Sequence, residues 1–222
     1  AHQMNNSHQV ITGRIEIAKE ETGAASAATE SLNKAQSEIG EVSWLIQKLM
    51  TYAQVTQVKP VKIKVVDAVN FIVQEQQALA KQYDISSSVT GLRPEQTAFM
   101  DEASFYAIIR ELISNAVEAS EPGTLILIST EHERFEESTL VMQQVVSPGQ
   151  YVRVSVSDQG RGMSASEIDT AFDPFHSASN RVGRGLGLST VQSSIEVAGG
   201  AIDIESAPGV GTKVSILVPV PT

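Results

Sequence analysis

The most informative segment of this sequence is Asp158-Gln159-Gly160-Arg161-Gly162-Met163. It follows residues 151–157, in which apolar and polar side chains alternate as in a half-buried strand. We therefore expect the chain to leave a sheet, present a carboxylate and turn through two glycines. Glycine tolerates positive φ, which lets the backbone pass close to a ligand. Asp158 could accept hydrogen bonds from an exocyclic amine such as that of adenine. An ordinary turn after a strand is the alternative that this segment alone leaves open.

The composition indicates a globular protein of one large domain or two small ones. The chain has 222 residues, of which 41% are hydrophobic and 19% charged, and a net charge of −10. This negative charge argues against binding to nucleic acid or to anionic membranes. The sequence has no cysteine, which excludes disulfides, thiol catalysis and cysteine-bound metals. No apolar run approaches the roughly 20 residues of a membrane span, and no signal-peptide pattern is present. We expect a soluble, cytoplasmic protein without direct membrane contact.

Residues 1–58 are predicted to form two long helices. In the second, apolar or small side chains recur at alternating steps of three and four from Leu32 to Thr56, and a weaker seam runs from Met4 to Ala25. Residues 23–26 are the expected reversal. Two such helices cannot bury their seams against each other alone, so we expect a homodimeric four-helix bundle. A hairpin packed on its own C-terminal domain is the alternative.

Pro60 ends the second helix, and residues 59–222 then have a different pattern. Helices are expected from Asp67 to about residue 83, from Asp101 to about residue 121, and from about residue 185 to Gly199-Gly200. An acidic, mobile connection is expected at 131–138, and an irregular segment at 164–184. Strands are expected at 61–66, 85–89, 97–100, 125–130, within 141–156, at 201–205 and at 212–218. Helices and antiparallel strands in irregular order indicate an α+β sandwich.

Glu111 and Asn115 lie four residues apart and share one face of the second of these helices. Both stand among apolar residues, where an unpaired polar group is costly to bury. A hard divalent cation bound with nucleotide phosphates would satisfy them, since Mg²⁺ prefers oxygen ligands. Side chains that point to solvent are the alternative.

Glycines recur in Gly183-Arg184-Gly185-Leu186-Gly187, directly before the last predicted helix. Glycines that open a helix expose backbone N–H groups to anions, and Arg181 and Arg184 could add charge-assisted contacts to phosphate. The cluster lies late in the chain and does not follow a strand in a βαβ unit, which excludes a Rossmann site. A flexible loop is the alternative.

Together and in this order, these motifs, with Phe172-Asp173-Pro174-Phe175 and Gly209-Val210-Gly211-Thr212, resemble the ATP-binding domain of sensor histidine kinases. That domain belongs to the GHKL superfamily, which also includes gyrase, a heat-shock chaperone and mismatch-repair ATPases. The resemblance covers residues 60–219 and implies an α/β sandwich.

The resemblance also implies roles for individual residues in binding ATP and Mg²⁺. Asn115 would ligate Mg²⁺, Glu111 would act as a base or hold a Mg²⁺-bound water, and Asp158 would bind the adenine amine. Gly160 and Gly162 would shape the base pocket. The other nucleotide-binding positions would be Phe172 and Phe175 in a mobile lid, and Arg181, Gly183, Arg184, Gly185, Leu186, Gly187 and Thr212.

The N-terminal hairpin resembles the dimerisation and histidine-phosphotransfer domain of the same family. His2-Gln3-Met4-Asn5-Asn6 is similar to the H-D-x-N-N box of one kinase subgroup. His2 would be autophosphorylated by ATP, and the phosphoryl group would pass to an aspartate of a response-regulator receiver domain. Asn6 would orient a water for dephosphorylation. The implied domains are 1–58 for dimerisation and phosphotransfer and 59–222 for catalysis.

The chain departs from the family pattern at several positions. Gln3 replaces the acidic residue after the phosphoacceptor, Glu118 a lysine that touches phosphate, and Arg181 a glycine. The basic residue usual soon after Phe175 is also missing. A phosphotransfer or phosphatase-biased module with impaired kinase activity is therefore an alternative function, as is another GHKL ATPase.

Overall fold

The computed structural model describes residues 60–173 and 187–221, together with the single positions Ile11, Ile15, Ala18, Leu32 and Ala35. Those five positions are helical, in agreement with the helices predicted there. The predicted four-helix bundle, with His2 and Asn6, otherwise lies outside the described residues. The described residues 60–169 and 191–221 belong to one compact unit.

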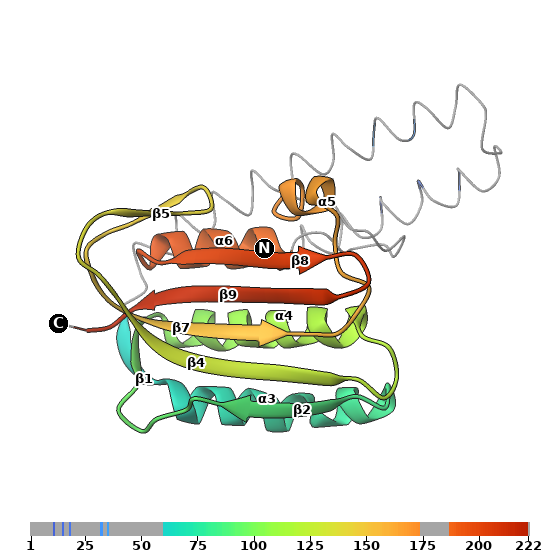
Figure 1. Cartoon of the computed structure of the whole chain (residues 1–222), viewed down its shortest axis with the longest axis horizontal. Coiled ribbons are helices and arrows are strands. Elements are labelled where there is room, and N and C mark those ends of the chain that lie inside the picture. Colours follow the sequence, from blue (N-terminus) through green and yellow to red (C-terminus); the bar gives the residue numbers. More distant parts are fainter. Residues whose placement is uncertain are drawn as a thin grey trace. The chain divides into compact units, whose positions relative to one another are not determined.

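A five-stranded sheet forms the centre of this unit (Figure 1). Its order is β2 (Ser86–Thr90), β4 (Leu125–Phe135), β7 (Gly149–Ser157), β9 (Gly211–Pro219) and β8 (Ala201–Ala207). Strands β2 and β4 are parallel, and the other neighbours are antiparallel. Two smaller antiparallel pairs are β1 (Val61–Lys64) with β3 (Thr97–Met100) and β5 (Thr139–Val141) with β6 (Gln144–Val146).

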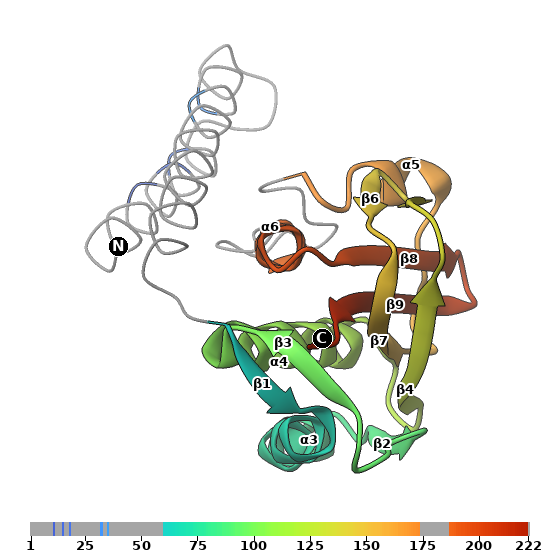
Figure 2. The same ribbon diagram turned by 90° about the vertical axis from the view of Figure 1, so that its left-hand side faces the viewer.

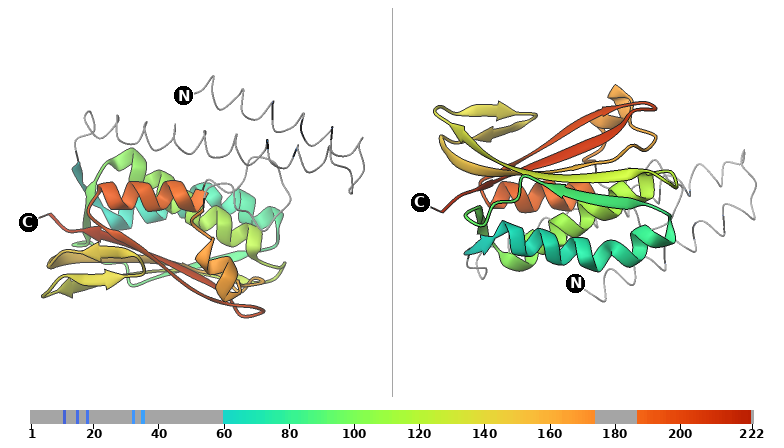
Figure 3. Two further views of the ribbon diagram at one scale, coloured as in Figure 1. Left: turned by 90° about the horizontal axis from the view of Figure 1, so that it is seen from above. Right: turned by 60° about the horizontal axis from the view of Figure 1, so that its bottom comes forward.

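Helices cover one face of the five-stranded sheet. They are α3 (Val65–Gln82), α4 (Glu102–Ala119) and the C-terminal part of α6 (Gly187–Val197) (Figure 2). The β5–β6 hairpin lies on the opposite face (Figure 3). Alternate strand residues such as Ile128, Val154 and Ile216 are fully buried and form the core with the apolar face of α4. The predicted α+β sandwich is therefore confirmed. No helix in the described part of the chain is long and apolar enough to cross a membrane.

Helix α4 begins as predicted, with Asp101 as its N-cap. Asp101 Oδ2 accepts hydrogen bonds from the backbone N of Ser104 at 2.8 Å and from its hydroxyl at 2.6 Å. The first of these bonds satisfies the N–H of Ser104, which has no acceptor within the helix because it lies in the first turn.

Helix α3 begins at Val65, so the predicted cap at Asp67 and a strand extending to residue 66 are wrong. Val65 is fully buried, and its N–H donates to the carbonyl of Gln96 at 3.1 Å. The side chain of the N-cap residue, Lys64, makes no capping hydrogen bond. Burial of the first apolar residue and a tertiary hydrogen bond thus set the start of this helix.

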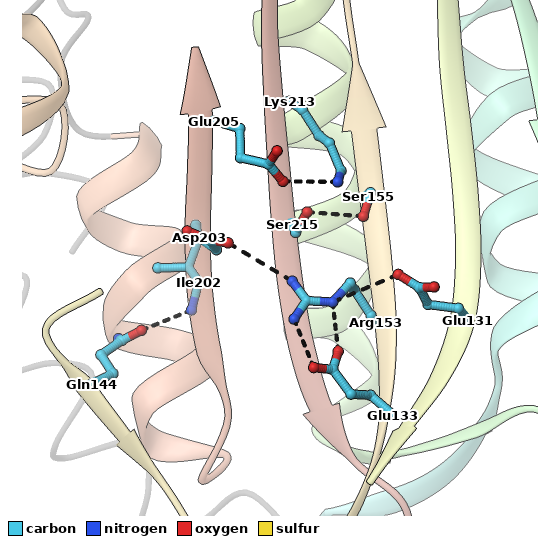
Figure 4. A network of polar contacts seen from close by, with 10 residues as sticks. All are labelled: Glu131, Glu133, Gln144, Arg153, Ser155, Ile202, Asp203, Glu205, Lys213 and Ser215. Carbon is cyan, nitrogen blue, oxygen red and sulfur yellow. Dashed lines mark hydrogen bonds and ion pairs between the residues drawn. The ribbon is translucent and has the colours of Figure 1, made fainter. Parts of the chain in front are cut away.

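The predicted mobile connection at 131–138 is wrong in its first part, because β4 continues to Phe135 and pairs with β7 throughout. The acidic side chains are compatible with a strand because Arg153 lies opposite them (Figure 4). Arg153 Nε is 2.6 Å from Glu133 Oε2 and 3.7 Å from Glu131 Oε1, and Arg153 Nη1 is 3.9 Å from Asp203 Oδ2. A cross-strand cation thus stabilises a segment that resembles a loop in sequence.

The segment expected to be irregular from 164 onward begins with a short helix, α5 (Ala165–Asp169). Ser164 and Glu167 form a capping box: the N of Ser164 donates to Glu167 Oε2 at 2.8 Å, and the N of Glu167 donates to Ser164 Oγ at 3.4 Å. The hydrogen bonds from Ser164, with a smaller contribution from Arg161, lower the pKa of Glu167 to about 2. The Ser-x-x-Glu spacing was the signal for this helix.

The described part of helix α6 begins at Gly187, and the predicted start near Gly185 lies outside the described residues. It ends before Gly199 and Gly200, as predicted. Gly199 has φ +75°, and the N–H of Gly200 donates to the carbonyl of Ile195 at 2.9 Å. This left-handed turn leads directly into β8.

Candidate functional site

Asp158, Thr212 and Ser206 form a row across the ends of three adjacent strands. Asp158 follows β7, and its N–H donates to the carbonyl of Thr212 on β9 at 2.8 Å. Thr212 pairs with Ser206 on β8. Because strand side chains alternate between faces, all three lie on the helix-covered side, two residues beyond Val156, Val214 and Ile204. The carboxylate predicted at a strand end is therefore found there.

The carboxylate of Asp158 is held in one orientation by two backbone donors. Its Oδ1 accepts hydrogen bonds from the N–H of Gly160 at 2.8 Å and of Thr212 at 3.2 Å. Within the described part of the chain, no donor contacts Oδ2. Burial raises the pKa of Asp158, and the two backbone donors oppose that shift. The half-buried group thus presents one fixed acceptor oxygen, which suits an amine donor.

Gly160 and Gly162 stand where no side chain fits. A Cβ at Gly160 would lie 2.1 Å from the carbonyl oxygen of Ala119, and one at Gly162 would lie 1.9 Å from that of Ala207. Gly162 also has φ +66°, in the left-handed region. The two glycines therefore let the loop after β7 pack directly on the end of α4 and on β8. Their contribution to a base pocket stays a prediction.

Helix α4 brings Glu111 and Asn115 toward the same loop. Glu111, Asn115 and Ala119 are spaced by four residues and form one stripe of the helix. The stripe ends at the loop, because the carbonyl of Ala119 accepts a hydrogen bond from the N–H of Arg161 at 3.3 Å. Both polar side chains are half-buried. In residues 60–173 and 187–221, neither makes a hydrogen bond to the protein.

The oxygens of Glu111 and Asn115 are chemically suited to Mg²⁺. The described residues contain no group of three His, Cys, Asp or Glu side chains that could hold a metal ion by themselves. A cation at this stripe would therefore need further oxygen ligands from phosphate or water. Glu118 is exposed. It is the residue that replaces the phosphate-contacting lysine of the family pattern given in the sequence analysis.

Ser206 was not predicted as a site residue. Its Oγ lies 2.8 Å from the N of Met163, 2.9 Å from the carbonyl O of Gly211 and 2.8 Å from Thr212 Oγ1. It thus joins the loop after β7 to the β8–β9 turn. Its position directly before Ala207-Pro208-Gly209 gave no signal of this role, because the contact depends on the pairing of β8 with β9.

The other predicted site residues are only partly covered by the structure. Phe172 is half-buried in the segment after α5, and Gly187 is the first residue of α6. His2, Asn6, Phe175, Arg181, Gly183, Arg184, Gly185 and Leu186 lie outside the described residues.

Comparison with known proteins agrees with this geometry. Residues 100–222 match the family model described as "Histidine kinase-, DNA gyrase B-, and HSP90-like ATPase". The sensor histidine kinase ZraS of Klebsiella oxytoca is 46% identical over 69 residues, 31% of this chain and 15% of that protein. ZraS of Escherichia coli K12 is 23% identical over 99% of this chain and 44% of its own length. The chain thus spans less than half the length of these relatives.

A solved structure supports the same fold. The catalytic domain of histidine kinase ThkA superposes with a TM-score of 0.60 at 20% identity, covering 73% of this chain and 96% of that domain. At this identity the similarity establishes the fold alone. With the family match, it confirms the predicted resemblance to the ATP-binding domain of sensor histidine kinases.

Proposed function

We propose, since the chain belongs to the family of histidine kinase-, DNA gyrase B- and HSP90-like ATPases, that it is the catalytic core of a two-component sensor histidine kinase. It uses ATP to phosphorylate His2 and transfers the phosphoryl group to an aspartate of a response-regulator receiver domain. An imidazole nitrogen is a suitable nucleophile for a γ-phosphoryl group when the charge is neutralised and the groups are aligned.

The observation that carries this proposal is the orientation of Asp158. Two backbone N–H groups hold its Oδ1, and a row of residues at the strand ends fixes its position. The remaining oxygen is an acceptor for the 6-amino group of adenine. Gly160 and Gly162 keep the loop close to α4 and β8, so the base binds beside a rigid backbone.

We assign phosphate and metal binding to the residues near α4 and α6. Asn115 would hold Mg²⁺, which would neutralise charge on the phosphates, and Glu111 would orient a metal-bound water or act as a base. The glycines at 183, 185 and 187, with Leu186, Thr212, Arg181 and Arg184, contact the nucleotide. Phe172 and Phe175 belong to the lid.

The N-terminal segment supplies the phosphoacceptor and the dimer. Residues 1–58 form the four-helix bundle with a second copy, and residues 59–222 are the catalytic domain. Asn6, one helical turn after His2, orients a water when the partner is dephosphorylated.

The decisive test is the intact mass of the protein after incubation with Mg-ATP, compared with the His2→Ala variant. One added phosphoryl group that is acid-labile and absent from the variant supports the proposal. An equal increase in mass in the wild type and in His2→Ala would refute His2 as the phosphoacceptor.

Gln3 favours a second function, because the carboxylate that would polarise the His2 imidazole is missing. A chain that binds ATP but gains no mass, and that removes phosphate from a phosphorylated receiver domain, would be a phosphatase-biased module. A chain that hydrolyses ATP without either reaction would be another ATPase of the superfamily.

A further inference from the structure

Arg161 lies between the two glycines of the loop after β7, and its backbone is held on both sides. Its N–H donates to the carbonyl of Ala119, the last residue of α4, at 3.3 Å. Its carbonyl accepts a hydrogen bond from the N–H of Gly209, in the turn between β8 and β9, at 2.7 Å. Gly160 and Gly162 pack too closely on the neighbouring backbone for either to carry a side chain. The loop therefore fixes the point from which the Arg161 side chain extends.

This side chain reaches the next helix in the chain. Arg161 Nη1 lies 3.1 Å from Glu167 Oε1. The other oxygen, Glu167 Oε2, accepts hydrogen bonds from the N–H and the hydroxyl of Ser164, at 2.8 Å and 2.9 Å. One carboxylate thus contacts the loop after β7 with one oxygen and forms the capping box of α5 with the other.

Helix α5 depends on such contacts because it is short. It has five residues, and a helix of this length is not stable through its own hydrogen bonds. None of its residues is buried, so the packing of apolar side chains contributes little. The ion pair of Arg161 and Glu167 has side chains that are 56% and 35% exposed. An ion pair exposed to this degree changes an equilibrium by about fivefold at most.

We propose that the ion pair of Arg161 and Glu167 couples nucleotide binding at the loop after β7 to the formation of α5, with Arg161 as a positioning residue. This inference rests on the proposed nucleotide function. A base bound to Asp158 restricts the loop, so less conformational entropy is lost when Arg161 pairs with Glu167. Because coupling between two equilibria is reciprocal, the formation of α5 strengthens nucleotide binding by the same factor.

The first measurement is the exchange rate of the Ile168 N–H, which donates to the carbonyl of Ser164 at 3.0 Å when α5 is formed. The whole chain is compared with and without saturating ADP, which has the adenine base but no γ-phosphoryl group to transfer. In the wild type, ADP should slow this exchange about threefold. In Arg161→Met, the exchange should be faster without ADP, and ADP should not slow it.

The second measurement is the affinity for ADP by titration calorimetry. Arg161→Met and Glu167→Gln should each weaken ADP binding about threefold. The double variant should lose no more than either single variant, because all three lack the same contact. Glu167→Gln is the sharper of the two single variants, because glutamine can still form a capping box but has no charge for Arg161.

Two control variants separate this role from a general effect of charge. Arg161→Lys keeps the positive charge and should retain both the slower exchange with ADP and the wild-type affinity. Lys213→Met removes another exposed ion pair, in which Lys213 Nζ lies 2.8 Å from Glu205 Oε1. Lys213 lies on the face of the sheet opposite to Thr212, so this variant should change neither measurement.

The possible results are distinguishable. If ADP slows the exchange of Ile168 equally in the wild type and in Arg161→Met, or in neither, the inference is overturned and nucleotide binding stands. Additive losses of affinity in the double variant would also overturn it, because Arg161 would then act on the nucleotide without Glu167. A wild-type chain that does not bind ADP would overturn both this inference and the proposed function. If Arg161→Met does not fold, Glu167→Gln serves for the exchange measurement, with the same expected result.

Discussion

Asp158→Asn separates the contribution of this side chain to nucleotide binding from its contribution to stability. The two side chains have nearly the same shape, and the amide oxygen of asparagine can still accept the hydrogen bonds from Gly160 and Thr212. The second oxygen, however, becomes an NH₂ group, so an acceptor turns into a donor. The adenine amine would then face another donor.

The expected loss of affinity follows from the charge on the lost acceptor. A hydrogen bond to a charged group contributes about 1.5–3 kcal/mol, so ATP affinity should fall by about 10- to 150-fold. Titration calorimetry at pH 7 measures this directly. Equal ATP affinity in the wild type and Asp158→Asn would refute the assignment of Asp158 to the adenine amine.

The same variant should not be less stable at pH 7. Burial raises the pKa of Asp158 above its unfolded value, so the ionised carboxylate weakens the fold at neutral pH. The contribution of this group is fully favourable below the unfolded pKa and is lost as the pH rises through the folded pKa. The free energy of unfolding of the wild type should therefore rise relative to that of Asp158→Asn only at acid pH. Urea unfolding from pH 3.5 to 7 tests this, and a variant clearly less stable at pH 7 would contradict it.

Three other perturbations test the fold around the site. Gly160→Ala should destabilise the protein by about 3 kcal/mol in urea unfolding, because its Cβ would meet the carbonyl of Ala119 at 2.1 Å. The control is Gly123→Ala, which has φ +83° but no atom within 4 Å, and it should cost only about 1 kcal/mol; equal losses would contradict the steric argument. Arg153→Met should cost about 2 kcal/mol, because this 15% exposed side chain pairs with Glu133. Arg134→Met, at 66% exposure, should change stability by less than about 0.5 kcal/mol, and a loss as large as that of Arg153→Met would refute the distinction. The N-cap of α5 should persist at mild acid and weaken as the pH falls from about 4.5 toward 2, because the pKa of Glu167 is lowered to about 2. Amide exchange in α5 over that range tests this, and a Glu167→Gln variant with the same pH profile as the wild type would contradict it.

Local sequence signals predicted the elements whose boundaries depend on nearby residues. Asp101 caps α4, Gly199-Gly200 closes α6, and the alternation at 151–157 gives β7. The order of the glycine motifs and Asp158 predicted the family. These features could be predicted because capping, alternation and positive φ act within a few residues along the chain.

Tertiary contacts decided the rest. Val65 begins α3 because it is buried and bonded to Gln96, and residues 131–135 extend β4 because Arg153 lies on the neighbouring strand. The sequence alone predicted the position of Asp158 at a strand end, and its role as an acceptor for the adenine amine stays a prediction. The contacts of Ser206 with Met163, Gly211 and Thr212, however, depend on the pairing of β8 with β9. Residues far apart in sequence meet only when the sheet forms, so no local pattern could show which side chains are in contact.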